Sequence, residues 1–227
     1  MQLSDFAAAN NLVELFLKRA DERGDRPFLG AKHDGEWQTI SWREAAERIC
    51  LLAESLRGLG LADGDRVMLV SENRPEWLIA DLAIMAAGCI TTPAYTTNTE
   101  RDHQHILDNS GARAVIVSTE KLARPLVPAI MRTGIADHLI AMETVKSSQS
   151  YSFSCHSWDA LLAGDAAAAR RAVEERMAKV GRTDTACIIY TSGTGGAPRG
   201  VQLSHGAILC NVEGAAHVLA EDFGWGE

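Results

Sequence analysis

The sequence predicts an α/β protein built on a layered, largely parallel sheet flanked by helices. Strand-like and helix-like segments alternate along its 227 residues, which is the pattern of successive βαβ units. The strand-like segments are almost continuously apolar, as expected where helices cover both faces of a sheet. The length allows one large domain or two small ones, and neither an internal repeat nor a low-complexity tract divides the chain.

The amino-terminal segment predicts a helix followed by a hairpin. Apolar residues between Leu12 and Ala20 recur at helical spacing and predict an amphipathic helix. Residues 27–31 and 37–40 have the composition of strands, and Asp34-Gly35 between them is typical of a hairpin turn.

Capping chemistry sets the helix boundaries in the middle of the chain. Residues 41–44, Ser-Trp-Arg-Glu, match a capping box, and the helix that follows should end near Gly58 or Gly60. Pro75 can begin the next helix, because it lacks the amide that a first helical turn leaves unused. Periodicity predicts strands over 66–70, 89–92, 114–117 and 138–141, and helices over 76–87, 99–109 and 120–131, the last containing Pro125 and Pro128.

The carboxyl-terminal segment holds the most unusual composition. Residues 144–157 are polar and serine-rich and predict a loop, and residues 165–179 predict a largely exposed helix. The elements expected after them are a buried strand over 185–190, a glycine-rich loop over 191–200, a short strand over 201–203, and a helix from His205 towards Ala220 capped by Ser204.

Composition and charge exclude several classes of function. The formal net charge of −8 argues against nucleic-acid binding, which normally needs a basic face. The most apolar segment, 77–90, is too short to span a bilayer and is interrupted by Asp81, so at most peripheral membrane contact is expected. No secretory leader is visible, and five widely spaced cysteines indicate neither zinc nor disulfides but small buried side chains in a cytoplasmic protein.

The segment from Tyr190 to Val201, Tyr-Thr-Ser-Gly-Thr-Gly-Gly-Ala-Pro-Arg-Gly-Val, has the chemistry of a polyphosphate site. Its glycines allow tight turns and close approach of the backbone to a ligand, and successive amides in such a turn form a nest for an anion. Thr191, Ser192 and Thr194 add hydroxyl donors. Arg199 adds a positive charge whose planar fork can grip two phosphate oxygens.

Two common phosphate-binding patterns do not fit this segment. The spacing of Gly195 and Gly200 matches a Walker A loop, but Val201 and Gln202 replace its Lys and Ser/Thr. A dinucleotide-binding fingerprint fails because Pro198 stands where its third glycine belongs. On chemistry alone, a generic glycine-rich surface turn therefore remains an alternative.

The same segment resembles the signature loop of the acyl-adenylate-forming (AMP-binding) superfamily, usually Tyr-Thr-Ser-Gly-Thr-Thr-Gly-x-Pro-Lys-Gly-Val. Residues 203–205, Leu-Ser-His, also match what commonly follows that loop. A second resemblance, to the long-chain fatty acyl-CoA synthetases, lies in Glu-Asn-Arg-Pro-Glu-Trp at 72–77 and in Ile-Leu-x-Asn-Ser-Gly-Ala at 106–112. Two departures from the usual loop are Gly195 in place of a second threonine and Arg199 in place of lysine.

This resemblance implies an acid-thiol ligase. Such enzymes join a carboxylic acid to ATP with Mg²⁺, giving an acyl-adenylate and pyrophosphate, and then transfer the acyl group to coenzyme A. The resemblance favours fatty acids as substrates and leaves aryl or short-chain acids open. It implies phosphate binding by the residues that match the loop: Thr191, Ser192, Gly193, Thr194, Gly195, Gly196 and Arg199.

The resemblance also implies that further parts of such an enzyme would follow this segment. We expect residues 1–227 to be an incomplete N-terminal AMP-binding domain without the C-terminal domain, inactive alone, with neither catalytic residues nor metal ligands. Surface exposed by the truncation could support a homo-oligomer. The alternative is a non-catalytic module that binds ATP or another protein.

Other polar and aromatic residues are expected to have structural roles. His103 and His105 are two apart on a predicted helix and so do not share a face. His205 could touch a phosphate, but a capping or packing role is at least as well supported. The remaining residues expected in packing or structural roles are Trp42, Trp77, Trp158, Glu72 and Asp81.

Overall fold

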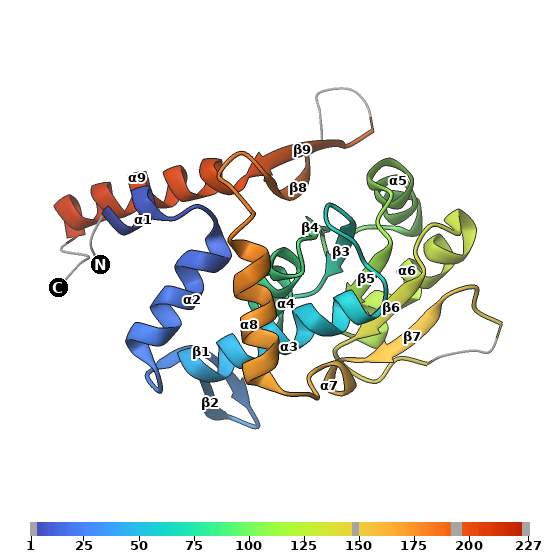
Figure 1. The fold of residues 1–227 in the computed structure, drawn as a ribbon. Helices are drawn as coiled ribbons and strands as arrows, with labels where there is room; N and C mark the ends of the chain where they lie inside the picture. The colour runs from blue at the N-terminus through green and yellow to red at the C-terminus, as the bar shows by residue number, and fades with distance from the viewer. Residues whose placement is uncertain (1–3, 147–149, 192–196, 224–227) are drawn as a thin grey trace.

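The computed structural model describes residues 4–146, 150–191 and 197–223 of the chain. Figure 1 shows the path of the chain through helices and strands. The helices are α1 Ser4–Ala8, α2 Leu12–Arg23, α3 Trp42–Gly58, α4 Pro75–Ala86, α5 Glu100–Ser110, α6 Glu120–Thr133, α7 Trp158–Leu161, α8 Ala166–Met177 and α9 His205–Phe223. The strands are β1 Pro27–His33, β2 Glu36–Ser41, β3 Arg66–Val70, β4 Ile90–Pro93, β5 Ala114–Val117, β6 His138–Ala141, β7 Ser154–Ser157, β8 Thr185–Thr191 and β9 Arg199–Ser204.

The described residues form a seven-stranded sheet with the order β7-β6-β5-β3-β4-β8-β9. Each neighbouring pair is parallel except β8 and β9, which pair antiparallel. The largely parallel sheet predicted from the sequence is therefore confirmed. Strands β1 and β2 pair separately as an antiparallel hairpin.

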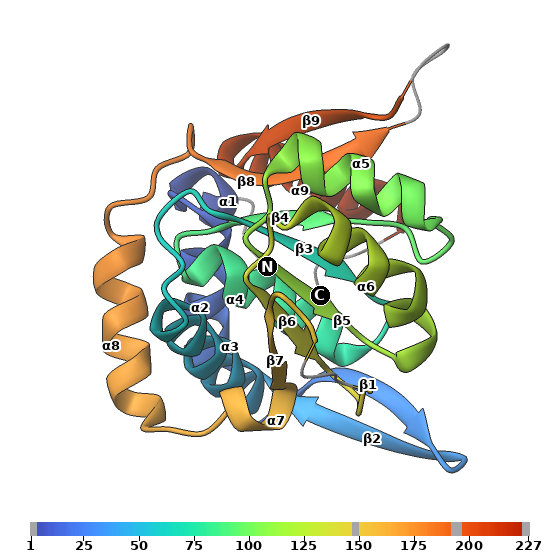
Figure 2. The same cartoon turned by 90° about the vertical axis from the view of Figure 1, so that its right-hand side faces the viewer.

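Helices cover both faces of the large sheet, which gives three layers. Side chains alternate along β3: Val67 and Leu69 join the apolar cluster built mainly with α2, α3, α4 and α8, whereas Met68 and Val70 join the cluster built with α5 and α6. Figure 2, viewed from a different side, shows α5 and α6 separated from α3 and α8 by the strands. The near-continuous apolar character of the strands follows from this double coverage.

The local signals read from the sequence are confirmed at atomic level. Ser41 and Glu44 form the predicted capping box at the start of α3, and Pro75 is the first residue of α4. α3 ends at Gly58, and Gly60 follows with φ of 90°. In the β1–β2 turn Asp34 and its neighbouring glycine both have positive φ, as a tight hairpin turn requires.

Three sequence predictions, on two loops and on the cysteines, need correction. Residues 154–157, predicted as part of a loop, form strand β7. The strand exists because its backbone pairs with β6, and its polar residues give no strand signal in the sequence. The glycine-rich loop is shorter than predicted, since Thr191 ends β8 and Arg199 begins β9. Two of the five cysteines, Cys155 and Cys210, are exposed rather than buried.

Helix α6 keeps its regular course through both of its prolines. Its apolar face is buried in the cluster shared with α5, and this burial outweighs the amide hydrogen bonds that Pro125 and Pro128 cannot make. Helix α8 buries one stripe formed by Ala169, Val173 and Met177, and its other residues are exposed or half-buried, so it is less exposed than predicted. Among the described residues, no helix is long and apolar enough to cross a membrane.

Candidate functional site

The candidate site is the hairpin formed by β8 and β9, whose connecting segment carries the glycine-rich motif. Thr191 at the end of β8 faces Arg199 at the start of β9, and both residues are exposed. The other predicted site residues, Ser192, Gly193, Thr194, Gly195 and Gly196, lie outside the residues that the structure describes.

The open end of this hairpin lies at the carboxyl edge of the parallel strands. β8 runs parallel to β4, with Thr91 opposite Cys187, so Thr191 lies at the same edge as the carboxyl ends of β3, β4 and β5. Ligands of open α/β sheets bind outside this edge. Thr191 and Arg199, both exposed, therefore lie at the edge of the sheet where such ligands bind.

Tyr190 and Gly200 form a cross-strand pair next to this open end. Tyr190 is buried at 4 % exposure, and its ring packs directly over Gly200. A Cβ added at Gly200 would lie 2.8 Å from Cγ2 of Ile188 and 3.1 Å from Cζ of Tyr190. The motif needs glycine here because Ile188 and the Tyr190 ring occupy the space of a side chain.

Replacing Gly200 with alanine should therefore force the Tyr190 ring and Ile188 to move. Overpacking of this kind typically costs about 2 kcal/mol of unfolding free energy. Denaturant unfolding of Gly200→Ala would measure the cost, and Gly214→Ala, where a Cβ meets nothing within 4 Å, is the matched control. Equal stability of the two variants would contradict the packing described here.

Helix α5 contacts both ends of the motif. The Tyr190 hydroxyl donates a 2.6 Å hydrogen bond to Oδ1 of Asn109, and Nε2 of His105 lies 2.7 Å from the carbonyl oxygen of Pro198. The rings of His105 and Tyr190 meet edge to face, with centroids 6.2 Å apart. Burial raises the pKa of Tyr190, so its hydroxyl keeps the proton that it donates. Figure 2 shows α5 lying beside the β8–β9 hairpin.

Sequence reasoning missed this role of His105, which it assigned to surface or packing. A usable signal was the i, i+4 spacing of His105 and Asn109, which puts both side chains on one helix face. His103, by contrast, is a core residue at 1 % exposure. The partners on the hairpin lie more than eighty residues away along the chain, and no local pattern identifies them.

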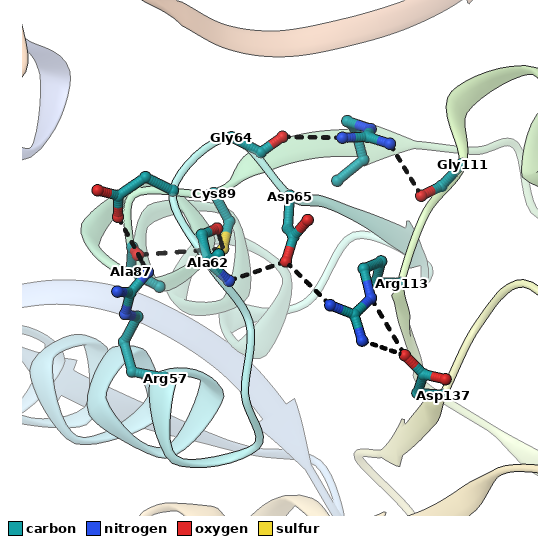
Figure 3. Close-up of polar contacts among 11 residues, drawn as sticks. Arg57, Ala62, Gly64, Asp65, Ala87, Cys89, Gly111, Arg113 and Asp137 are labelled. Carbon is teal, nitrogen blue, oxygen red and sulfur yellow. Dashed lines mark hydrogen bonds and ion pairs between the residues drawn. The ribbon is translucent and has the colours of Figure 1, made fainter.

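The carboxyl end of α5 is anchored by Arg66 at the start of β3. The Arg66 guanidinium donates to the carbonyl oxygens of Ser110, at 2.6 Å, and Gly111, at 3.1 Å, which end the helix. A cation at this position also interacts favourably with the helix dipole. Figure 3 shows Gly64 and Gly111, which receive hydrogen bonds from the same guanidinium. The second motif read from the sequence, at 106–112, thus serves to fix α5 in place.

The opposite edge of the sheet, at the amino ends of the strands, contains a cavity of about 680 Å³. Figure 3 shows the polar network there, in which Asp65 lies between the amide of Ala62 and Arg113. Thr185 and His205 line this cavity, and they lie at the end of the β8–β9 hairpin opposite Thr191 and Arg199. His205 is buried and accepts a hydrogen bond from the amide of Leu12, which confirms a packing role.

Glu72, one of the two carboxylates singled out from the sequence, has a structural partner. At the carboxyl edge, the Ser118 hydroxyl donates to Glu72. Burial alone would raise the pKa of Glu72. The hydrogen bond from Ser118 and the positive charge of Arg74 act in the opposite direction, and the net pKa of Glu72 is lowered. Among the described residues, no group of three or more histidine, cysteine or acidic side chains could hold a metal ion.

Comparison with known proteins gives concordant matches. The family model described as AMP-binding enzyme matches residues 16–226. The long-chain-fatty-acid–CoA ligase FadD15 of Mycobacterium tuberculosis is 32 % identical over 182 residues, covering 80 % of this chain and 29 % of that protein. Long chain acyl-CoA synthetase 3 of Arabidopsis thaliana is 26 % identical over 218 residues, covering 91 % of this chain and 32 % of the relative. The chain thus spans about a third of the length of these curated relatives.

Solved structures share the fold at low sequence identity. The anthranilate CoA ligase AuaEII, solved in complex with anthranoyl-AMP, aligns over 100 % of this chain and 39 % of its own, with a TM-score of 0.71 and 22 % identity. The adenylation domain of a carboxylate reductase from Mycobacterium chelonae aligns over 91 % of this chain and 36 % of its own, with a TM-score of 0.73 and 17 % identity.

Proposed function

Since the chain belongs to the AMP-binding enzyme family, we propose that the segment between β8 and β9 binds the β- and γ-phosphates of ATP. The observation that carries this proposal is the pairing of exposed Thr191 with exposed Arg199 at the carboxyl edge of the sheet. In the proposal, Arg199 neutralises phosphate charge, and the hydroxyls and amides contributed by Thr191, Ser192, Gly193, Thr194, Gly195 and Gly196 complete the phosphate contacts.

The reaction proposed for the whole protein is ATP-dependent activation of a fatty acid followed by thioester formation with coenzyme A. Its support is the similarity to long-chain-fatty-acid–CoA ligases and acyl-CoA synthetases along most of this chain. A carboxylate must approach the α-phosphorus of a polyanion, so the charge of the distal phosphates has to be compensated before attack. Mg²⁺ bound to ATP would supply part of that compensation, and this chain supplies Arg199.

Residues 1–227 form, in this proposal, part of the N-terminal AMP-binding domain and bind ATP without completing the reaction. Exchange of radiolabelled pyrophosphate into ATP, measured on the purified 227-residue chain with a fatty acid and Mg²⁺, tests the second half of this statement. We expect no exchange above background, and sustained exchange would overturn it.

The role of Arg199 is tested by isothermal titration with Mg·ATP and with tripolyphosphate. Loss of a charge-assisted hydrogen bond corresponds to about tenfold weaker binding, which is expected for Arg199→Ala with both ligands. Arg199→Lys restores the charge and should recover most of the affinity, whereas Arg101→Ala, which removes an exposed cation of α5, is the matched control. Equal affinity of Arg199→Ala and the wild-type chain would rule out the assignment.

A further inference from the structure

We propose that α5 holds the two strand ends that flank the proposed phosphate-binding segment, and that His105 is the positioning residue for Arg199. This inference rests on the proposed function and adds to it a residue outside the glycine-rich motif. Tyr190 immediately precedes Thr191, and Pro198 immediately precedes Arg199, so the two contacts with α5 bracket the proposed phosphate-binding segment.

The two contacts come from one face of one helix. His105 and Asn109 are four residues apart, so their side chains lie one above the other along α5. The helix itself is fixed at both ends: Thr99 and Asp102 form a capping box at its start, and Arg66 binds its last carbonyls. The pairing of β8 with β9 brings the two strand ends together, and α5 holds each of them from the same side through Asn109 and His105.

The contact of His105 also sets the direction of a peptide group. Because a trans peptide is planar, a carbonyl that points towards α5 turns the following amide N–H in the opposite direction. The Pro198 carbonyl accepts the His105 hydrogen bond, so the N–H of Arg199 points away from α5. His105 thereby orients both the amide of Arg199 and the start of the strand that carries its guanidinium.

The hydrogen bond also requires a particular state of the imidazole. A carbonyl oxygen can only accept, so Nε2 of His105 must carry the proton. In the neutral ring this is the Nε2–H tautomer, with Nδ1 unprotonated. A long-range ¹⁵N–¹H spectrum of the wild-type chain at neutral pH reports this tautomer directly, and a dominant Nδ1–H tautomer would contradict the inference.

The positioning role is tested by tripolyphosphate titration of His105 variants of the 227-residue chain. Loss of the hydrogen bond that orients the start of β9 at Arg199 should weaken binding about fivefold in His105→Ala. His105→Gln keeps an N–H donor of similar reach and should restore binding to within about twofold of the wild type. Gln104→Ala, a neutral substitution on the neighbouring residue of α5, is the control and should leave affinity unchanged.

The outcomes separate the two proposals. If the wild-type chain binds and Arg199→Ala weakens binding, but His105→Ala matches Gln104→Ala, the role of His105 is rejected while the phosphate site stands. If the wild-type chain does not bind tripolyphosphate, the proposed function fails and the positioning role falls with it. If His105→Ala unfolds, the comparison rests on His105→Gln and His105→Asn: the shorter amide should not reach Pro198, and equal affinity of these two variants would reject the role.

Discussion

Asn11→Ala is expected to lower the free energy of unfolding by about 4 kcal/mol, because a fully buried side chain would lose three hydrogen bonds at once. Nδ2 of Asn11 donates to the carbonyl oxygens of Met177 and Val180, each at 3.1 Å. Its Oδ1 accepts the amide of Glu14 and caps α2. The variant would leave the buried carbonyl of Met177, the half-buried carbonyl of Val180 and a helix amide without these partners. Urea unfolding at neutral pH measures the change.

The neighbouring asparagine provides a matched control. Asn10 is exposed, so Asn10→Ala should change stability by less than about 0.5 kcal/mol. Asn11→Asp separates the two roles of the side chain, since a carboxylate can still cap α2 but places an oxygen against two carbonyl oxygens. We expect Asn11→Asp to be destabilised at neutral pH as well. A stability of Asn11→Ala close to that of Asn10→Ala would show that Asn11 does not tie α2 to the end of α8.

Two desolvated titratable groups, the buried His103 and the half-buried Asp81, should give the protein opposing responses to pH. Burial lowers the pKa of His103 to about 4, so between pH 6.5 and 4 the unfolded chain binds a proton that the folded chain does not. This contribution to stability is present above pH 6.5 and falls by about 3 kcal/mol as the pH drops to 4.

Burial raises the pKa of Asp81 to about 6, so the folded chain is protonated where the unfolded chain is not. The Asp81 contribution has the opposite sign: about 3 kcal/mol is lost as the pH rises from 4 to 6.

Single variants should reveal the two contributions separately. Relative to the wild type, Asp81→Asn should gain about 3 kcal/mol at pH 7 and nothing at pH 4, because only the charged carboxylate is penalised. His103→Leu should gain stability relative to the wild type as the pH falls from 6.5 to 4, by about the same amount. Unfolding free energies at half-unit pH steps measure both differences. A wild-type-like pH profile for either variant would show that the corresponding group is not desolvated.

The fold was largely predictable because its signals are local. Strands β5 and β6 match the predicted ranges, and the capping box at Ser41 places the start of α3. Strand β7 was missed for a non-local reason: its four residues are polar, and only pairing with β6 makes them a strand. The antiparallel pairing of β9 was not predicted either, since register depends on which strands meet in the folded chain.

The candidate site was only partly predictable. Its glycine-rich segment stands out in composition, and Thr191 and Arg199 lie where a ligand-binding loop should begin and end. The contribution of α5 could not be seen, because His105 and Pro198 are 93 residues apart and neither residue is unusual in its own surroundings. The need for glycine at position 200 likewise appears only when the ring of Tyr190 is placed above it.

The two outermost strands of the large sheet, β7 and β9, differ in how readily they could recruit another chain. β7 has four residues, Ser-Cys-His-Ser, and offers a short polar template. β9 has six residues and carries Val201 at 45 % exposure, so it offers the longer and more apolar border. β9 therefore offers the better template for backbone pairing with another strand, and Arg199 is the first residue of that template.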